Sequence, residues 1–113
     1  MVYRYYQNWG KYRGAAGSMI RFYLPRSDVV DTGDMSPASV MAWTACDQAF
    51  RNLSGTERDI VRAYYSETYD KEKQKPDPMT HVAETYCIEI SEVKKIIDRT
   101  IRMVVVNRGL ADE

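Results

Sequence analysis

Apolar residues recur at helical spacing through most of the chain, and this pattern predicts an all-α protein. The broadest apolar stripe follows Ser36 and Pro37, an N-cap residue and a first-turn proline, and predicts a helix to about Asn52. A second helix is expected from Thr56, whose hydroxyl can cap its exposed amides. No segment shows the alternation of a strand, and the sequence contains no internal repeat. The residues expected to face the core from these two helices are Val40, Met41, Trp43, Thr44, Ala45, Phe50, Leu53, Ile60, Val61, Tyr64 and Tyr65.

The carboxyl third predicts two further helices, broken near Cys87 and Ile88. Thr80 is placed to cap the first of them. The second runs from about residue 89 to 106 and stops at Asn107 and Gly109, which tolerate the left-handed conformation of a helix end. The expected inward residues are Val82, Ala83, Tyr86, Ile88, Val93, Ile96, Ile97, Ile101 and Val104.

The amino end interleaves aromatic and basic side chains. Gly10, Gly14 and Gly17 argue against one rigid helix, so we expect a short helix near residues 2–13 and a second helix or an extended piece near 15–24. Two loops are also predicted, one over residues 25–37, rich in Pro, Gly, Ser and Asp, and one over the charged residues 70–78. The expected organisation is an aromatic, basic extension (residues 1–35) packed on a helical domain (residues 36–110).

Charge narrows the function classes. The chain has 113 residues, enough for one domain, and its 16 Lys and Arg balance its 16 Asp and Glu. A nucleic-acid face must therefore come from local segregation of charge. Residues 1–26 carry five bases and no acid, residues 27–79 have a net charge of −4, and residues 80–113 one of −1.

Reactive side chains are few. Cys46 and Cys87 lie among apolar neighbours, which predicts buried, reduced thiols rather than a disulfide. With His81 as the single imidazole, and no CxxC pair or glycine-rich phosphate loop, we expect no metal, no cofactor and no enzyme. The sequence has neither the apolar core of a signal peptide nor a membrane-spanning run, which predicts a cytoplasmic protein.

The segment VAETYCIEISEVKKII, residues 82–97, resembles the helix-turn-helix of the fourth region of bacterial sigma factors and of small sigma-like phage regulators. Ala83 matches the small residue between the helices, Ile88 the buried residue after the turn, and Val93 with Ile96 the underside of the second helix. LSGTERDIVRAYY, residues 53–65, resembles the preceding helix of that family, and GL at residues 109–110 its usual ending. The resemblance covers residues 53–110 and implies a small helical bundle with a helix-turn-helix at residues 80–106.

Two positions depart from the family pattern. Cys87 stands where the family usually has glycine, so the turn must hold a side chain in a conformation that costs about 1 kcal/mol. Glu89 stands where a serine is usual, and its carboxylate complements the helix dipole but repels phosphates.

Carried over residue by residue, the resemblance implies a DNA-binding face on the second helix of the motif. The pattern also places Glu89 on this face, towards the major groove, where its carboxylate would weaken binding to DNA. The basic residues of the amino end offer contacts to a DNA backbone or a partner, although the aromatics around them can equally pack on the core and leave these bases in solvent. The DNA-binding residues are Ile90, Ser91, Lys94, Lys95, Arg99 and Arg102, and the additional basic candidates are Arg4, Lys11, Arg13 and Arg21.

Two functions remain open. The first is a transcription regulator encoded by a phage or mobile element that binds double-stranded DNA, with a homodimer as one option. The second is a phage-encoded inhibitor, of the anti-sigma or anti-CRISPR type, that uses the same fold to bind a host protein such as RNA polymerase or a nuclease. The zero net charge, Glu89 and nine tyrosines favour the inhibitor.

Overall fold

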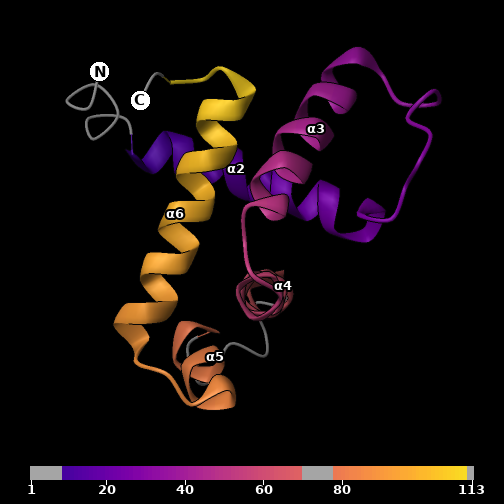
Figure 1. Cartoon of the computed structure of the whole chain (residues 1–113). Helices are drawn as coiled ribbons and strands as arrows, with labels where there is room; N and C mark the ends of the chain where they lie inside the picture. Colours follow the sequence, from indigo (N-terminus) through magenta and orange to yellow (C-terminus); the bar gives the residue numbers. More distant parts are fainter. Residues whose placement is uncertain (1–8, 70–77, 112–113) are drawn as a thin grey trace. The chain divides into compact units, whose positions relative to one another are not determined.

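All regular elements in the described part of the chain, residues 9–69 and 78–111 of a computed structural model, are helical (Figure 1). The all-α prediction is confirmed for these residues. No helix among them is long and apolar enough to cross a membrane. The elements are α2 (Trp9–Tyr23), the 3-10 helix η1 (Leu24–Arg26), α3 (Pro37–Arg51), α4 (Gly55–Tyr69), α5 (Pro78–Tyr86) and α6 (Ile90–Arg108).

The chain divides into two compact units. The first unit combines Met1–Asn52 with Ile101–Glu113, and the second unit is Leu53–Thr100. Helix α6 contributes its residues up to Thr100 to the second unit and the remainder to the first.

In the first unit, α2 is one uninterrupted helix, so the prediction that its glycines break it is wrong. A glycine inside a helix costs only about 1 kcal/mol relative to alanine. Burial of large side chains on one face, including Tyr12, Ile20 and Tyr23, offsets that cost. This face includes the small residues Ala16 and Gly17, also buried, and α2 packs against α3.

Helix α3 begins and ends where the sequence predicted. The Ser36 hydroxyl oxygen accepts a hydrogen bond from the Ser39 amide at 3.2 Å, Pro37 occupies the first turn, and Asn52 forms the C-cap. The prediction of a buried Met41 is wrong, because this side chain is 51% exposed. The covered face of α3 consists of Ala45, Cys46, Ala49 and Phe50, whereas Val40, Trp43 and Thr44 are half-buried.

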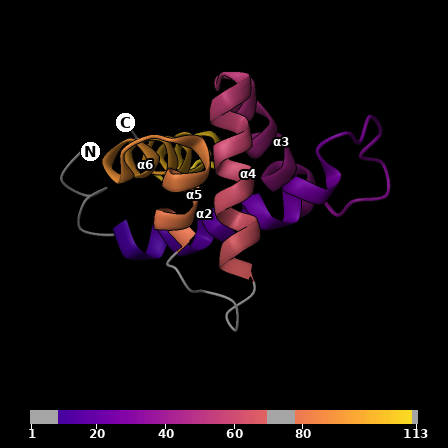
Figure 2. The ribbon, with the colours of Figure 1, turned by 90° about the horizontal axis from the view of Figure 1, so that it is seen from below.

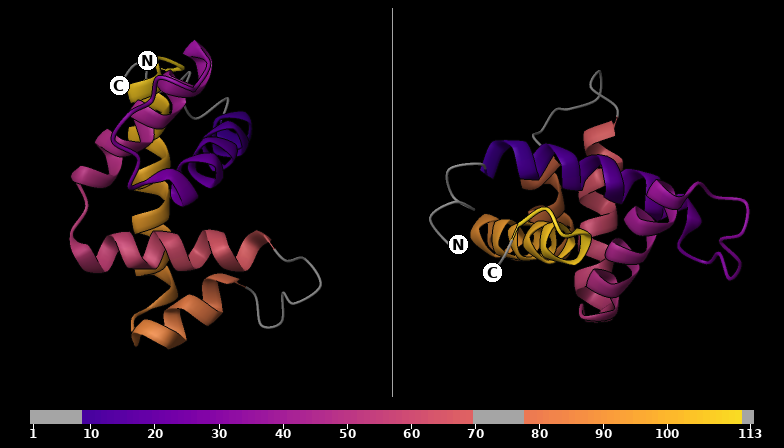
Figure 3. Two further views of the ribbon diagram at one scale, coloured as in Figure 1. Left: turned by 90° about the vertical axis from the view of Figure 1, so that its right-hand side faces the viewer. Right: turned by 90° about the horizontal axis from the view of Figure 1, so that it is seen from above.

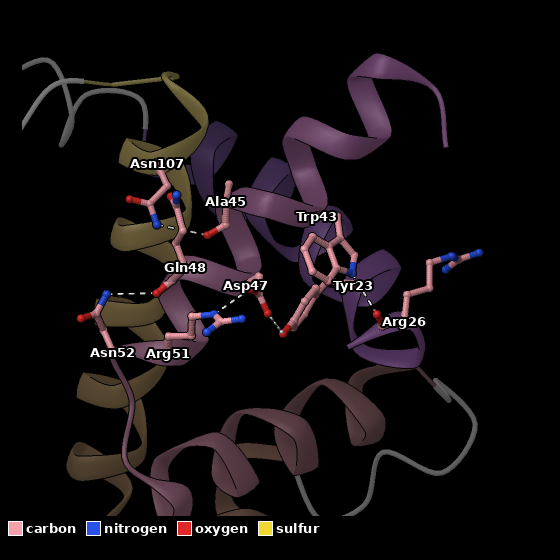
Figure 4. A network of polar contacts seen from close by, with 9 residues as sticks. All are labelled: Tyr23, Arg26, Trp43, Ala45, Asp47, Gln48, Arg51, Asn52 and Asn107. Atoms are coloured by element: carbon pink, nitrogen blue, oxygen red, sulfur yellow. Dashed lines mark hydrogen bonds and ion pairs between the residues drawn. The ribbon is translucent and has the colours of Figure 1, made fainter. Parts of the chain in front are cut away.

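Polar and aromatic contacts tie α2 to α3 around Tyr23 (Figure 4). The Tyr23 hydroxyl donates to a carboxylate oxygen of Asp47 at 2.9 Å, and Arg51 donates to the other oxygen at 2.8 Å. The Tyr23 ring packs against those of Phe50 and Trp43, with centroids 5.1 and 5.7 Å away. The buried aromatic ring thus keeps a partner for its polar end.

The loop between η1 and α3 confirms the predicted break in helical structure, which starts at Ser27 rather than Pro25 (Figure 3). It contains a turn in which the Met35 amide donates to the Thr32 carbonyl at 3.0 Å and the Gly33 amide donates to the Asp31 carboxylate at 2.8 Å. The Trp43 indole donates to the Arg26 carbonyl at 2.8 Å (Figure 4), which fixes the start of the loop against α3.

In the second unit, Ser54 rather than Thr56 caps α4. The Ser54 hydroxyl accepts from the Glu57 amide at 3.1 Å, and the Glu57 carboxylate accepts from the Ser54 amide at 2.9 Å. This reciprocal pair of hydrogen bonds is a capping box. It satisfies two exposed amides, whereas Thr56 acting as the cap would satisfy only one. The Thr56 prediction is therefore wrong, while the core residues Ile60, Val61 and Tyr65 are buried as expected.

Helix α5 packs beside α4, as the two views in Figures 1 and 2 agree. It begins at Pro78, so Thr80 is its third residue and not the predicted cap. Proline is well placed in a first turn because the helix makes no use of an amide there. The loop predicted before it lies, up to residue 77, outside the described residues.

The two cysteines differ in environment. Both are free thiols, which confirms the prediction of reduced cysteines. Cys46 is buried, and that burial raises the pKa of its thiol to about 12, with a smaller contribution from Asp47. Cys87 is exposed, so its predicted burial is wrong: it occupies the turn after α5 rather than a core-facing helical position.

Candidate nucleic-acid interface

The junction of α5 and α6 is a short turn with a left-handed residue. The predicted break is confirmed, because α5 ends at Tyr86 and α6 starts at Ile90. Cys87 has a φ of 56°, the conformation that favours glycine, as its position in the motif predicted. The Ile88 amide donates to the Ala83 carbonyl at 3.0 Å and the Cys87 amide to the Glu84 carbonyl at 3.3 Å, the bond pattern of a Schellman helix end.

Glu89 forms the start of α6 through its backbone. Its carbonyl accepts from the amides of Glu92 at 3.0 Å and Val93 at 3.2 Å, so the helix is closed from its first turn. The Glu89 side chain is exposed next to the positive end of the helix dipole. Together with the turn at Cys87, these bonds fix the direction in which α6 leaves α5.

The underside of the motif is mostly buried. Ala83, Val93 and Ile96 are 4%, 0% and 9% exposed. Ile88, expected to be buried as well, is only half-buried, because it lies between the two helices and belongs to neither. Val82 and Ile97 complete the buried set, and Tyr86 is half-buried.

The first turns of α6 present four of the predicted DNA-binding residues to solvent. Ser91, Lys94 and Lys95 are exposed, and Ile90 is 48% exposed. The Lys95 ammonium lies 3.5 Å from the Glu92 carboxylate, with side chains that are 74% and 54% exposed. Such an exposed pair contributes little and leaves the lysine available to a stronger anion.

Arg99 has a partner inside the second unit. Its guanidinium donates to the carboxylate of Glu57, the residue that forms the capping box with Ser54. The Ser54 amide, and then Arg99, hold the pKa of the Glu57 carboxyl below its usual value of 4.5. Arg99 therefore connects α6 to the start of α4, 42 residues earlier in the sequence. The sequence contained the Ser-x-x-Glu signal of the capping box, but no signal for this distant ion pair.

The remaining predicted contacts do not lie in the second unit. Arg102 is half-buried in the part of α6 that belongs to the first unit. Lys11 and Arg21 are exposed on α2 and Arg13 is half-buried there, whereas Arg4 lies outside the described residues. The structure thus brings Ile90, Ser91, Lys94, Lys95 and Arg99 together on the part of α6 that belongs to the second unit.

Within residues 9–69 and 78–111, no group of three or more His, Cys, Asp and Glu side chains is arranged to hold a metal ion. His81 is exposed on α5. Comparison with protein-family models, with curated proteins and with solved structures finds no match to this chain.

Proposed function

We propose that α5, the turn at Cys87 and the first half of α6 form a helix-turn-helix that binds double-stranded DNA. The protein would then be a cytoplasmic transcription regulator encoded by a phage or mobile element, a role suggested by the resemblance of residues 82–97 to the sigma-factor motif. The observation that carries this proposal is the left-handed conformation of Cys87 in the short turn between α5 and α6. Ser91, Lys94 and Lys95 are exposed on α6 directly after this turn. In helix-turn-helix proteins, the amino-terminal residues of the second helix contact base edges in the major groove.

Electrostatic attraction at this face depends on few residues. Between Ile90 and Thr100, three bases oppose Glu92 and Asp98, and Arg99 is already paired with Glu57. Lys94 and Lys95 are therefore the two cations that supply attraction to phosphates. The ammonium group of each would pair with a phosphate of the DNA backbone.

Charge reversal tests the DNA-binding role directly. Lys94→Glu combined with Lys95→Glu should abolish binding to a random-sequence duplex in a gel-shift titration, while the circular dichroism melting curve stays within a few degrees of wild type because both side chains are exposed. Wild-type affinity should fall steeply between about 50 and about 200 mM salt.

The matched control reverses two exposed bases of the first unit, Lys11→Glu with Arg21→Glu. This variant should retain most of the duplex affinity if α6 is the interface. Absence of wild-type binding at about 50 mM salt, where phosphate contacts are strongest, would contradict the DNA-binding function. If the Lys94 and Lys95 variant bound the duplex as tightly as wild type, the DNA-binding interface would not lie on α6.

An inhibitor that binds a host protein is the second candidate. It is favoured by the exposed Ile90, which stands between Glu89 and Glu92, since an apolar residue with an acidic rim suits a protein surface better than phosphates. With bacterial RNA polymerase or a phage-targeting nuclease as bait, an inhibitor should bind as wild type and fail to bind as Ile90→Glu. If the wild-type protein bound neither bait but shifted DNA in a gel, the result would contradict the inhibitor function and support the transcription regulator.

A further inference from the structure

Ile90 is the one large hydrophobic side chain that is exposed among the described residues of the second unit. It is the first residue of α6 and directly follows Glu89, whose carbonyl accepts the first hydrogen bonds of the helix. The apolar residues that follow it on α6 within this unit, Val93, Ile96 and Ile97, are 0–9% exposed. Ile90 thus belongs to the apolar pattern of the helix but is not covered by the chain's own core.

The backbone around Ile90 is fixed on both sides. The Schellman bonds at Cys87 and Ile88 precede it, and the Glu89 carbonyl is bonded to the amide of Val93 after it. A β-branched side chain at such a place has few rotamers, so its methyl groups have a defined direction. Lys94, one turn later on the same side of the helix, is exposed beside it.

The chemistry of the major groove makes one base the natural partner for this side chain. Thymine alone among the four bases presents an apolar group there, its C5 methyl. The neighbouring Glu89 carboxylate is an acceptor only, so it is unfavourable opposite the N7 and O6 acceptors of guanine. The aliphatic side chain therefore favours an A·T pair with the thymine methyl group towards the helix. The acid beside it disfavours guanine but adds no preference for thymine, whose O4 is also an acceptor.

Resting on the proposed DNA-binding function, we infer that Ile90 is a specificity-determining residue that contacts a thymine methyl group. Lys94 and Lys95 supply affinity that is independent of sequence, and Ile90 supplies the preference for thymine at one position of the site. The inference names the substrate class more narrowly than the proposed function does: duplexes with thymine opposite the start of α6.

Two polymers that differ only in the methyl group test this contact. Wild-type protein should bind alternating poly(dA-dT) about fourfold more tightly than alternating poly(dA-dU), which is the expected effect of losing one buried methyl group. Ile90→Ala should bind the two polymers equally. Ile90→Val, which keeps a β-branched apolar side chain, should retain most of the preference.

Leu110→Ala is the matched control, because Leu110 is a comparably exposed aliphatic residue of the first unit, 39% exposed. It should preserve the wild-type ratio between the polymers, which would show that the loss of the ratio is specific to Ile90. The loss in Ile90→Ala itself excludes DNA shape as the cause, because a shape difference would act on both proteins. Equal wild-type affinity for both polymers would overturn the inference and leave the proposed function intact. A ratio unchanged in Ile90→Ala would overturn it as well, and failure of the wild type to bind either polymer would overturn both.

Discussion

The two compact units end a helix with the same hydrogen bonds but with different residues. In the first unit, α6 stops at Gly109, whose φ is 83°, and the Leu110 amide donates to the Val105 carbonyl at 3.0 Å. In the second unit, α5 stops at Cys87 with the same Schellman pattern. Glycine adopts this conformation at no steric cost, whereas a residue with a Cβ does so at about 1 kcal/mol. The junction between α5 and α6 is thus kept at a cost that the other helix end avoids.

The two units differ in net charge, and the unit that contains the proposed DNA-binding interface is the negatively charged one. The sequence of the first unit has eight basic and six acidic residues, and that of the second has eight basic and ten acidic ones, giving +2 and −2. The candidate DNA-binding helix turns lie in the acidic unit. The charge of a whole unit therefore does not locate the interface, and attraction to DNA must arise locally at Lys94 and Lys95.

Val93→Asp should have the largest effect on the comparison, because it places a charge at a fully buried position of the second unit. An unpaired buried carboxylate should lower the free energy of unfolding by at least about 3 kcal/mol. Thermal melting followed by circular dichroism measures the loss. Lys94→Asp, at the exposed neighbouring position, is the control and should change stability by less than about 0.5 kcal/mol. A normal melting curve for Val93→Asp would mean that α6 does not pack through this face.

The two helix ends can be compared by reciprocal substitutions. Cys87→Gly should stabilise the protein by about 1 kcal/mol, and Gly109→Ala should destabilise it by a similar amount, since each change moves one turn towards the other's composition. Urea denaturation measures both free energies. Cys87→Ala separates the thiol from the backbone, because it removes the sulfur and keeps the Cβ, and it should be nearly neutral. Destabilisation by Cys87→Gly would show that the cysteine side chain stabilises the turn.

Local chemistry made the helix ends around the candidate site predictable from sequence. Ser36 with Pro37, the break at Cys87 and the stop at Gly109 each depend on residues within one turn of the chain, although α6 continues through Asn107 and ends two residues later than predicted, at Arg108. The exposure of Lys94 and Lys95 followed from the helical spacing of the apolar residues around them. The continuity of α2 was missed because burial of residues such as Ile20, which glycine content does not reveal, outweighs backbone preference.

Long-range pairing was the part of the candidate site that the sequence could not supply. Arg99 was expected to be available for phosphate, and its contact with Glu57 joins residues on two different helices. The Thr56 and Thr80 predictions failed for a more local reason. Ser54, two residues before Thr56, caps α4 through its capping box with Glu57, and α5 already begins at Pro78, two residues before Thr80. When two candidate cap residues lie within three positions of each other, the geometry of the helix end decides which of them forms the cap, and the spacing of residues in the sequence does not contain that geometry.

The smallest expected effect concerns the contact between Glu57 and Arg99, which distinguishes the second unit through its ion-paired capping box. The pKa of Glu57 is lowered by the Ser54 amide first and by Arg99 second, so its ionised form stabilises the folded state above the ordinary carboxyl value of 4.5. That stabilisation is lost as the pH falls below 4.5 and through the lowered pKa. Glu57→Gln should therefore reduce stability by about 0.5 kcal/mol at about pH 7, and the difference from wild type should be smaller at about pH 3, below the ordinary carboxyl value. Urea titrations of the two proteins at both pH values measure this, with Glu84→Gln as the exposed-carboxylate control on α5. A difference that stayed constant between the two pH values would show that the Glu57 charge does not contribute, and that the loss comes from hydrogen bonds of the capping box that the amide of glutamine does not replace.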